Sequence, residues 1–270
     1  LAYTIAGHPK YTVTGGSITL DGEDVLEMSV DERARAGLFL AMQYPVEVPG
    51  VSVANFLRTA KTAIDGEAPK LRTWVKDVNA ALEHLNLDST FSARSVNEGF
   101  SGGEKKRHEI AQLELLDPKV AILDETDSGL DIDALKVVSE GVNRFREREG
   151  KGVLLITHYT RILRYIQPDK VHVFVDGKVA ESGGPELADK LEAEGGFEAQ
   201  ARKVERYLDE SYKKAMSMKN STRSKRCPVS TITATVFVPM TLTPIRFRAS
   251  ISARVMDCNR PGNCCTSISS

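Results

Sequence analysis

Two adjacent acids, Asp124 and Glu125, follow the short apolar run Val120–Leu123. A run without polar alternation predicts a strand buried on both faces of a parallel sheet, and open parallel sheets bind ligands at the carboxyl ends of their strands. Asp124 could hold Mg²⁺ through water, while Glu125 could orient or deprotonate a water that attacks a phosphate. The simpler interpretation is a solvated strand end that carries two acids.

A second candidate is the tetrad Ser101-Gly102-Gly103-Glu104, which precedes a helix expected to run to Leu116. Two residues without Cβ atoms leave the N-terminal amides of that helix open to an anionic oxygen, and Ser101 could donate to the same oxygen. Ser101 and Glu104 also fit a capping box that starts the helix. Both interpretations can hold, because a cap can double as an anion site.

The elements that must position these residues follow a βαβ pattern. Another apolar run, Leu38–Met42, predicts a buried strand with Gln43 at its carboxyl end. A crossover helix over Asp133–Arg148 would turn one apolar face to the sheet. That face carries Leu135, Val138, Val142 and Phe145, and the flanking strands are expected at Val120–Leu123, Val153–Ile156 and Val171–Val175.

Other segments complete the expected architecture. Leu1–Gly7 is typical of a helix end, closed by a glycine. A hairpin is expected where Ser17–Leu20 meets Asp24 across an Asp-Gly turn, followed by a helix with Ser29 and Glu32 as its capping box. From Val53 to about Leu87 the pattern is helical and charged, and Glu186–Lys214 predicts one or two surface helices.

Composition excludes several classes of function. Eight of the 36 basic residues and one of the 37 acidic residues lie from Lys219 onward, so the preceding body carries a net charge of about −8. Such a body is a poor nucleic-acid binder. No apolar run is long enough to span a membrane. All four cysteines lie in the last stretch without the spacing of a metal site, which favours a reducing, cytoplasmic compartment. They are Cys227, Cys258, Cys264 and Cys265.

The order of the motifs resembles that of the ATP-binding cassette (ABC) family. Five elements stand in its sequence: Gln43, then Ser101–Glu104, then Asp124-Glu125, then Ser128–Asp131, then His158. Within that family, Asp124-Glu-Thr-Asp-Ser-Gly-Leu-Asp131 and Phe100-Ser-Gly-Gly-Glu-Lys-Lys-Arg107 are similar to SufC, the ATPase of the SufBCD iron–sulfur cluster scaffold. The resemblance covers Leu1 to about Lys214.

This resemblance implies roles for individual residues. Asp124 and Gln43 would serve Mg²⁺. In catalysis, Glu125 would orient the attacking water or accept its proton, His158 would be the switch residue that touches the γ-phosphate, and Gln43 would sense the metal and the water. A third set would contact ATP bound mainly to the opposite subunit of a transient homodimer. That set is Ser101, Gly102, Gly103 and Glu104, with Asp131 reaching across the dimer. His108 stands where the family more often has Asn.

The implied fold is that of the ABC ATPases: α/β, with a mostly parallel sheet, a small antiparallel β part and an inserted helical subdomain at about 53–100. Residues 1–218 would form a partial ATPase domain and 219–270 a tail, disordered or frameshifted, unlike the family. The family has a first strand and a G-x-x-x-x-G-K-[ST] phosphate loop before the segment that matches Leu1–Gly7, and no such loop occurs in the printed sequence. We therefore expect these 270 residues alone neither to bind ATP tightly nor to hydrolyse it.

The expected function is an ATPase subunit that couples ATP binding and hydrolysis to conformational change in a scaffold of SufB and SufD homologues. One alternative is the ATP-binding subunit of a membrane transporter. Such subunits tend to have Pro-Thr-Ser-Ala after the paired acids, where this chain has Thr126-Asp127-Ser128-Gly129. Another alternative is a catalytically silent binding module.

Overall fold

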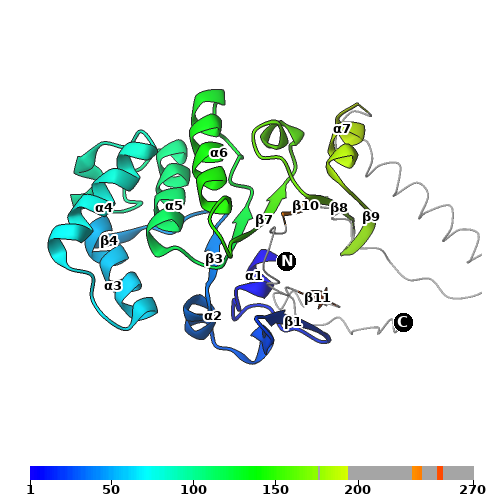
Figure 1. Ribbon diagram of the computed structural model, residues 1–270, viewed down its shortest axis with the longest axis horizontal. Coiled ribbons are helices and arrows are strands. Elements are labelled where there is room, and N and C mark those ends of the chain that lie inside the picture. The colour runs from blue at the N-terminus through cyan, green and yellow to red at the C-terminus, as the bar shows by residue number, and fades with distance from the viewer. Residues whose placement is uncertain (176, 194–232, 239–247, 252–270) are drawn as a thin grey trace, which may run out of the picture.

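The computed structural model describes residues 1–175, 177–193, 233–238 and 248–251. At its centre lies a six-stranded sheet in the order β3-β6-β7-β10-β8-β9, with helices packed against it (Figure 1). The strands are β3 (Leu38–Ala41), β6 (Val120–Asp124), β7 (Gly152–Thr157), β10 (Thr233–Val238), β8 (Lys170–Val175) and β9 (Lys178–Gly183).

The sheet is mixed: four of its six strands run in the same direction, as expected of a mostly parallel sheet, although three of its five pairings are antiparallel. β3 pairs with β6 and β6 with β7 in parallel. β10 runs antiparallel to both β7 and β8, so these two strands run parallel to one another on either side of it. β9 adds an antiparallel edge strand. The carboxyl ends of β3, β6 and β7 consequently meet at one edge of the sheet, where the candidate residues follow them.

A smaller antiparallel sheet lies beside the first helix. It has the order β11-β1-β2, with β1 (Gly16–Leu20), β2 (Glu23–Asp24) and β11 (Arg248–Ile251). The expected hairpin turns at Asp21 and Gly22, which both have positive φ. After η1 (Val25–Glu27), the predicted capping box of Ser29 and Glu32 opens α2 (Val30–Ala36), as expected. The first helix is α1 (Ala2–Ile5).

Helices follow one another from Val53 to Ala93, where the sequence predicts a helical insertion. They are α3 (Val53–Asp65), α4 (Leu71–His84) and η2 (Ser89–Ala93), flanked by the paired strands β4 (Val48–Ser52) and β5 (Ser95–Val96). In Figure 1 this group lies to one side of the central sheet. Trp74, only 3% exposed, joins α4 to α3 by donating its Nε1–H to the Ala54 carbonyl oxygen at 3.2 Å. It is a packing residue.

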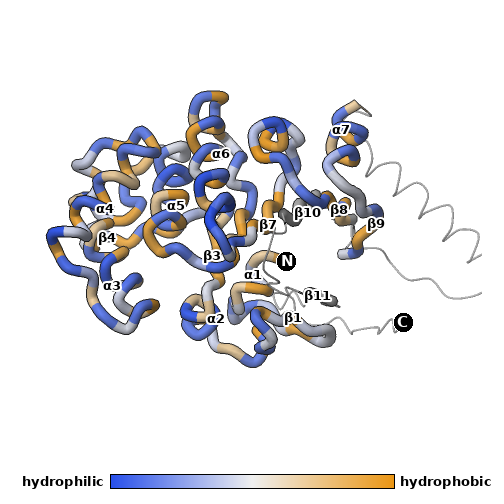
Figure 2. Tube along the Cα trace, viewed as in Figure 1, coloured by the Kyte–Doolittle hydropathy of each residue, from blue (hydrophilic) through white to orange (hydrophobic). Residues whose placement is uncertain are grey.

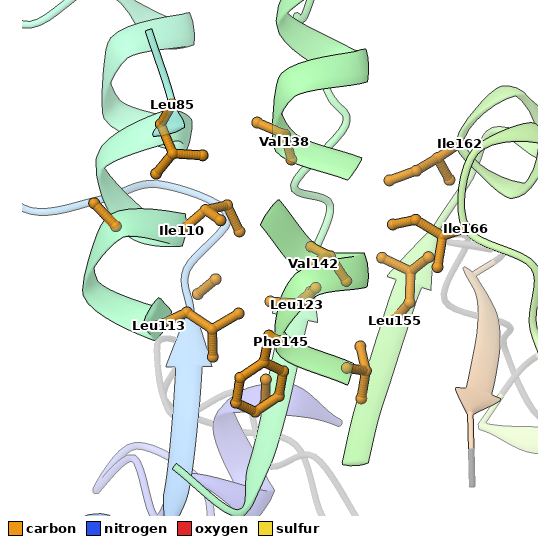
Figure 3. Close-up of a cluster of buried hydrophobic side chains, with 14 of the residues drawn as sticks. Leu85, Ile110, Leu113, Leu123, Val138, Val142, Phe145, Leu155, Ile162 and Ile166 are labelled. Carbon is orange, nitrogen blue, oxygen red and sulfur yellow. The ribbon is translucent and has the colours of Figure 1, made fainter. Parts of the chain in front are cut away.

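The main hydrophobic core lies between the sheet and two long helices, α5 (Gly102–Leu116) and α6 (Ile132–Arg146). The predicted face of α6, with Leu135, Val138, Val142 and Phe145, is buried. Figure 3 shows Val138, Val142 and Phe145 of α6 beside Ile110 and Leu113 of α5 and Leu123 of β6. Figure 2 shows apolar residues along the central strands and polar ones over the outer turns. The crossover β6-α6-β7 is the predicted βαβ unit.

The last part of the chain is described only in pieces. After η3 (Thr160–Arg164), α7 (Pro185–Ala193) covers the start of the stretch expected to be helical, and 194–214 lie outside the described residues. The predicted tail, 219–270, is described only at β10 and β11, so the division into domains at 218 stays a prediction. Among the described residues, no helix combines the length and apolarity that a membrane span requires.

Candidate active site

Three of the predicted catalytic side chains meet at one carboxylate. Gln43 donates its Nε2–H to Oε2 of Glu125 at 2.6 Å, and Nε2 of His158 lies 2.5 Å from Oε1 of the same acid. The side chain of Glu125 is 16% exposed and that of His158 is 27% exposed. Each carboxylate oxygen has two lone pairs, so both oxygens can still accept a hydrogen from a water molecule. The predicted grouping of Gln43, Glu125 and His158 is therefore present.

The parallel strands explain why residues so far apart in sequence meet. Gln43 follows β3 by two residues, Glu125 follows β6 directly and His158 follows β7 directly. The amide of Glu125 donates to the Ile156 carbonyl oxygen at 2.9 Å, which continues the β6–β7 pairing beyond the strand end. Glu125 itself has φ 50°, a left-handed backbone that is uncommon for a residue with a side chain. Such outliers gather at functional sites.

Asp124 ends β6 as a half-buried acid. Among the described residues, its side chain has no hydrogen-bond or ion-pair partner, while its backbone belongs to the ladder between β6 and β7. Burial raises the pKa of Asp124, and the neighbouring Glu125 raises it further. A carboxylate without a protein partner beside a second acid favours a bound cation, and Mg²⁺ is commonly held by one or two carboxylates together with phosphates and water. Within the described ranges no cluster of three metal-ligating side chains occurs.

The glycine pair and the residues around it form a separate part of the predicted site. Ser101 and Glu104 make the expected capping box: the Glu104 amide bonds to Oγ of Ser101 at 3.3 Å and the Ser101 amide to Oε2 of Glu104 at 2.7 Å. The bonds from Ser101 hold the pKa of Glu104 below its usual range. Ser101 and Gly102 are exposed at the start of α5, where they can reach another molecule.

Asp131 also has a structural role. Its Oδ1 accepts from the Ala134 amide at 2.7 Å and caps α6. A Cβ on Gly103 would lie 3.9 Å from Leu130, so the starts of α5 and α6 are neighbours. In the part of the chain that the structure describes, no hydrogen bond joins Ser101 or Asp131 to Glu125. The structure thus groups the predicted residues in two sets, one around Glu125 and one at the exposed helix starts.

A buried contact between two site loops was not predicted. Asp127, 1% exposed, accepts at Oδ2 from the Thr157 hydroxyl at 2.8 Å, and Arg161 donates to the Asp127 carbonyl oxygen at 2.6 Å. Burial raises the pKa of Asp127. The contact joins the turn after Glu125 to the residue before His158. In sequence, the only signal was an acid in a turn, which is equally typical of an exposed loop.

Comparison with known proteins agrees with this geometry. A family model described as ABC transporter matches residues 1–128. Vegetative protein 296 of Bacillus subtilis (strain 168) is 60% identical over 197 residues, which cover 72% of this chain and 75% of the relative. A probable ABC transporter ATP-binding protein of Streptococcus pyogenes serotype M18 is 52% identical over 197 residues, covering 72% and 77%. The chain belongs to the ABC ATPase family.

Further comparisons extend the likeness. The probable ATP-dependent transporter ycf16 of Cyanophora paradoxa is 51% identical over 195 residues, covering 71% of this chain and 75% of the relative. The dimeric ATP-binding cassette MJ0796, solved with ADP and Pi, has a TM-score of 0.56 at 19% identity, covering 64% of this chain and 74% of that chain. This second likeness shows the ABC cassette fold. Members of the ABC ATPase family bind ATP, normally with Mg²⁺, and hydrolyse it.

Proposed function

We propose that the chain is the ATPase subunit of a SufBCD-type iron–sulfur cluster assembly complex. In this role, ATP binding and hydrolysis at the junction of a transient homodimer would change the conformation of a scaffold built from SufB and SufD homologues. The observation that carries this proposal is the segment Thr126-Asp127-Ser128-Gly129, which stands where transporter subunits tend to have Pro-Thr-Ser-Ala.

The structure gives that segment a physical role. A threonine at position 127 would be shorter than Asp127 and would offer one acceptor oxygen in place of two, so it would not reproduce the contact with the Thr157 hydroxyl. The aspartate therefore adds a tie between the turn after Glu125 and the strand that ends before His158. This contact between Asp127 and Thr157 supports the proposal that the chain is not an ordinary transporter subunit.

Each catalytic site would combine the residues around Glu125 of one subunit with the exposed helix starts of the other subunit. Glu125 would orient the attacking water, while Gln43 and His158 hold its carboxylate and respond to the γ-phosphate. Asp124 would hold Mg²⁺, with Gln43 close to the metal. Ser101, Gly102, Gly103 and Glu104 would face nucleotide held by the opposite subunit, with Asp131 at the same junction. Mg²⁺ supplies charge neutralisation on the phosphates when it is bound.

Exposed apolar side chains support a protein partner. Tyr44 and Val46, which are 75% and 65% exposed, lie in the segment that follows Gln43. A docked scaffold subunit that covers them would sit one residue from a catalytic side chain. We propose a cytoplasmic location for this complex, in keeping with the absence of cysteine before Cys227.

The second candidate is the ATP-binding subunit of a membrane transporter, which the names of several relatives favour. Affinity capture of the tagged chain from its source cells, with membranes and cytosol processed separately, distinguishes the two. The proposal predicts recovery of SufB and SufD homologues from the cytosolic fraction. Recovery only with membrane permease subunits would contradict it. Capture with the Tyr44→Ser variant serves as a control for docking at the exposed segment.

A further inference from the structure

The segment that carries Gln43 is held by helix α5. Met42, the preceding residue, donates its amide hydrogen to Oε1 of Glu109 at 2.7 Å and accepts at its carbonyl oxygen from Nζ of Lys106 at 2.6 Å. Lys106 and Glu109 stand one helical turn apart on α5, and their charged ends lie 3.3 Å from each other. Both backbone groups of Met42 are thus bound by side chains of the same helix.

The far end of the same segment is bound to α5 as well. Asn97 donates its Nδ2–H to the Val46 carbonyl oxygen at 2.8 Å, and its Oδ1 lies 3.0 Å from Nδ1 of His108 on α5. Near the surface, Nζ of Lys105 contacts Glu47 at 2.8 Å. The segment from Met42 to Glu47 is therefore tied to α5 at both ends, with Gln43 between the ties.

The pair of Lys106 and Glu109 is unusual in its burial. Both side chains are only 6% exposed, in a helix whose next turn carries the fully buried Ile110 and Leu113. Removing two charges from water costs more than an isolated ion pair returns, and apolar residues of similar volume would often give equal or greater stability. A need for stability alone does not account for the pair. Apolar residues could not bind the amide and the carbonyl of Met42, and this is what the pair adds.

We propose that Lys106 and Glu109 are positioning residues that fix Gln43 against Glu125 by holding the Met42 peptide groups. This inference rests on the proposed catalytic role of Gln43 and Glu125. Ser101 caps α5, which begins at Gly102. The contacts of Lys106 and Glu109 with Met42, which we call the clamp, therefore connect this helix start, which would face another subunit, to the segment that places Gln43 against Glu125. Engagement of nucleotide by Ser101–Gly103 is then transmitted to Gln43 through α5.

The deciding variant is the double replacement Lys106→Met with Glu109→Leu in the full 270-residue chain. It removes both charges together, so no unpaired charge stays buried. The half-buried Met42 peptide groups lose these partners but can bind water, so the fold is expected to persist. Hydrogen–deuterium exchange followed by NMR should show the Met42 amide exchanging about tenfold faster or more, while amides in the middle of α5 keep their protection. The His158 ring resonances should shift, because Gln43 no longer holds Glu125 in place.

Matched controls separate positioning from packing. The single variant Glu109→Gln keeps an acceptor for the Met42 amide, so that amide should exchange at a rate close to that of the parent. Lys105→Met, which removes only the surface contact to Glu47, should leave Met42 and His158 unchanged. Unchanged Met42 exchange and His158 resonances in a folded double variant would overturn the proposal. If the double variant does not fold, Lys106→Met alone decides, because burial raises the pKa of Glu109 and lets it take up a proton once Lys106 is gone. A changed ¹⁵N shift of Gln43 in that variant is expected, and an unchanged shift would overturn the proposal.

These readouts do not depend on turnover, so they separate the clamp from the function it serves. If Glu125→Gln left ATP hydrolysis intact, the proposed catalytic role of Glu125 would be wrong. The exchange rate of the Met42 amide would still test whether Lys106 and Glu109 hold Met42 in place. In a chain that carries a phosphate loop, we expect the double variant to lower kcat at nearly unchanged KM. A change in KM alone would contradict a positioning role.

Discussion

Gly141 marks the closest approach of α6 to α5. A Cβ at this position would lie 2.4 Å from Cγ2 of Ile110 and 3.1 Å from Cδ2 of Leu85. Ile110 of α5 and Leu85, which follows α4, are completely buried, and Figure 3 shows both beside α6. The distance of 2.4 Å is more than 1 Å short of an ordinary carbon–carbon contact at about 3.5–4.0 Å, so the helices must separate or Ile110 must leave its rotamer.

The expected effect of Gly141→Ala combines two opposing terms. Overpacking a core costs about 1–3 kcal/mol, whereas alanine in a helix interior is about 1 kcal/mol more favourable than glycine. Because the contact with Ile110 is severe, we expect the overpacking cost to lie in the upper part of its range, where it exceeds the gain from alanine in the helix. We therefore predict a net loss of about 1–2 kcal/mol in the free energy of unfolding, measured by urea titration followed by circular dichroism.

A second substitution tests the proposed cause. Ile110→Leu moves the branch point along the side chain and removes the Cγ2 methyl that the new Cβ would meet. The double variant Gly141→Ala with Ile110→Leu should therefore be more stable than additivity predicts, by about 1 kcal/mol. A Gly141→Ala variant as stable as the parent, or strictly additive losses in the double variant, would refute the reasoning.

Three further predictions concern other groups. Burial lowers the pKa of His108 to about 4, so on acidification the unfolded chain takes the proton first and stability is lost as pH falls from about 6.5 to 4. His108→Asn should therefore gain about 2 kcal/mol relative to the parent between pH 7.5 and pH 5 by urea unfolding, and parallel pH slopes would exclude this. Thr157→Val should cost about 1–3 kcal/mol, because it removes the donor to Asp127 and the acceptor of the Tyr159 amide. Ser139→Ala removes a buried hydroxyl that has no hydrogen-bond partner among the described residues and should cost less; equal losses would contradict a stabilising role of the Thr157 hydroxyl. A phosphate-release assay on residues 1–270, with and without a strand and phosphate loop placed before Leu1, should show Mg-ATP turnover only with the loop; equal turnover in both would contradict the role assigned to such a loop.

Sequence patterns predicted the elements that bring the candidate catalytic side chains together. Apolar runs before Gln43, Asp124 and His158 identified parallel strands, and parallel strands present their carboxyl ends at a common edge. The capping box at Ser101 and Glu104 was likewise predictable, since its two bonds are local. In these cases a short stretch of sequence determines the geometry, and family resemblance supplied the roles.

Long-range polar contacts were not predictable in this way. Lys106 and Glu109 read as part of a charged helix start, and only the packing of α5 against the end of β3 reveals that they bind Met42. The contact between Asp127 and Thr157 spans 30 residues, and either side chain could equally have faced solvent. Burial of polar groups depends on how the elements pack, which a single sequence does not specify.

The most direct test of the central claim is the turnover of a chain extended by a strand and a phosphate loop before Leu1, compared with its Glu125→Gln variant. If Glu125 orients the attacking water, the variant should still bind Mg-ATP and should form a more persistent dimer, while its rate of phosphate release falls by about 10²–10⁴-fold. An extended chain in which Glu125→Gln hydrolyses ATP at the parental rate would contradict the claim.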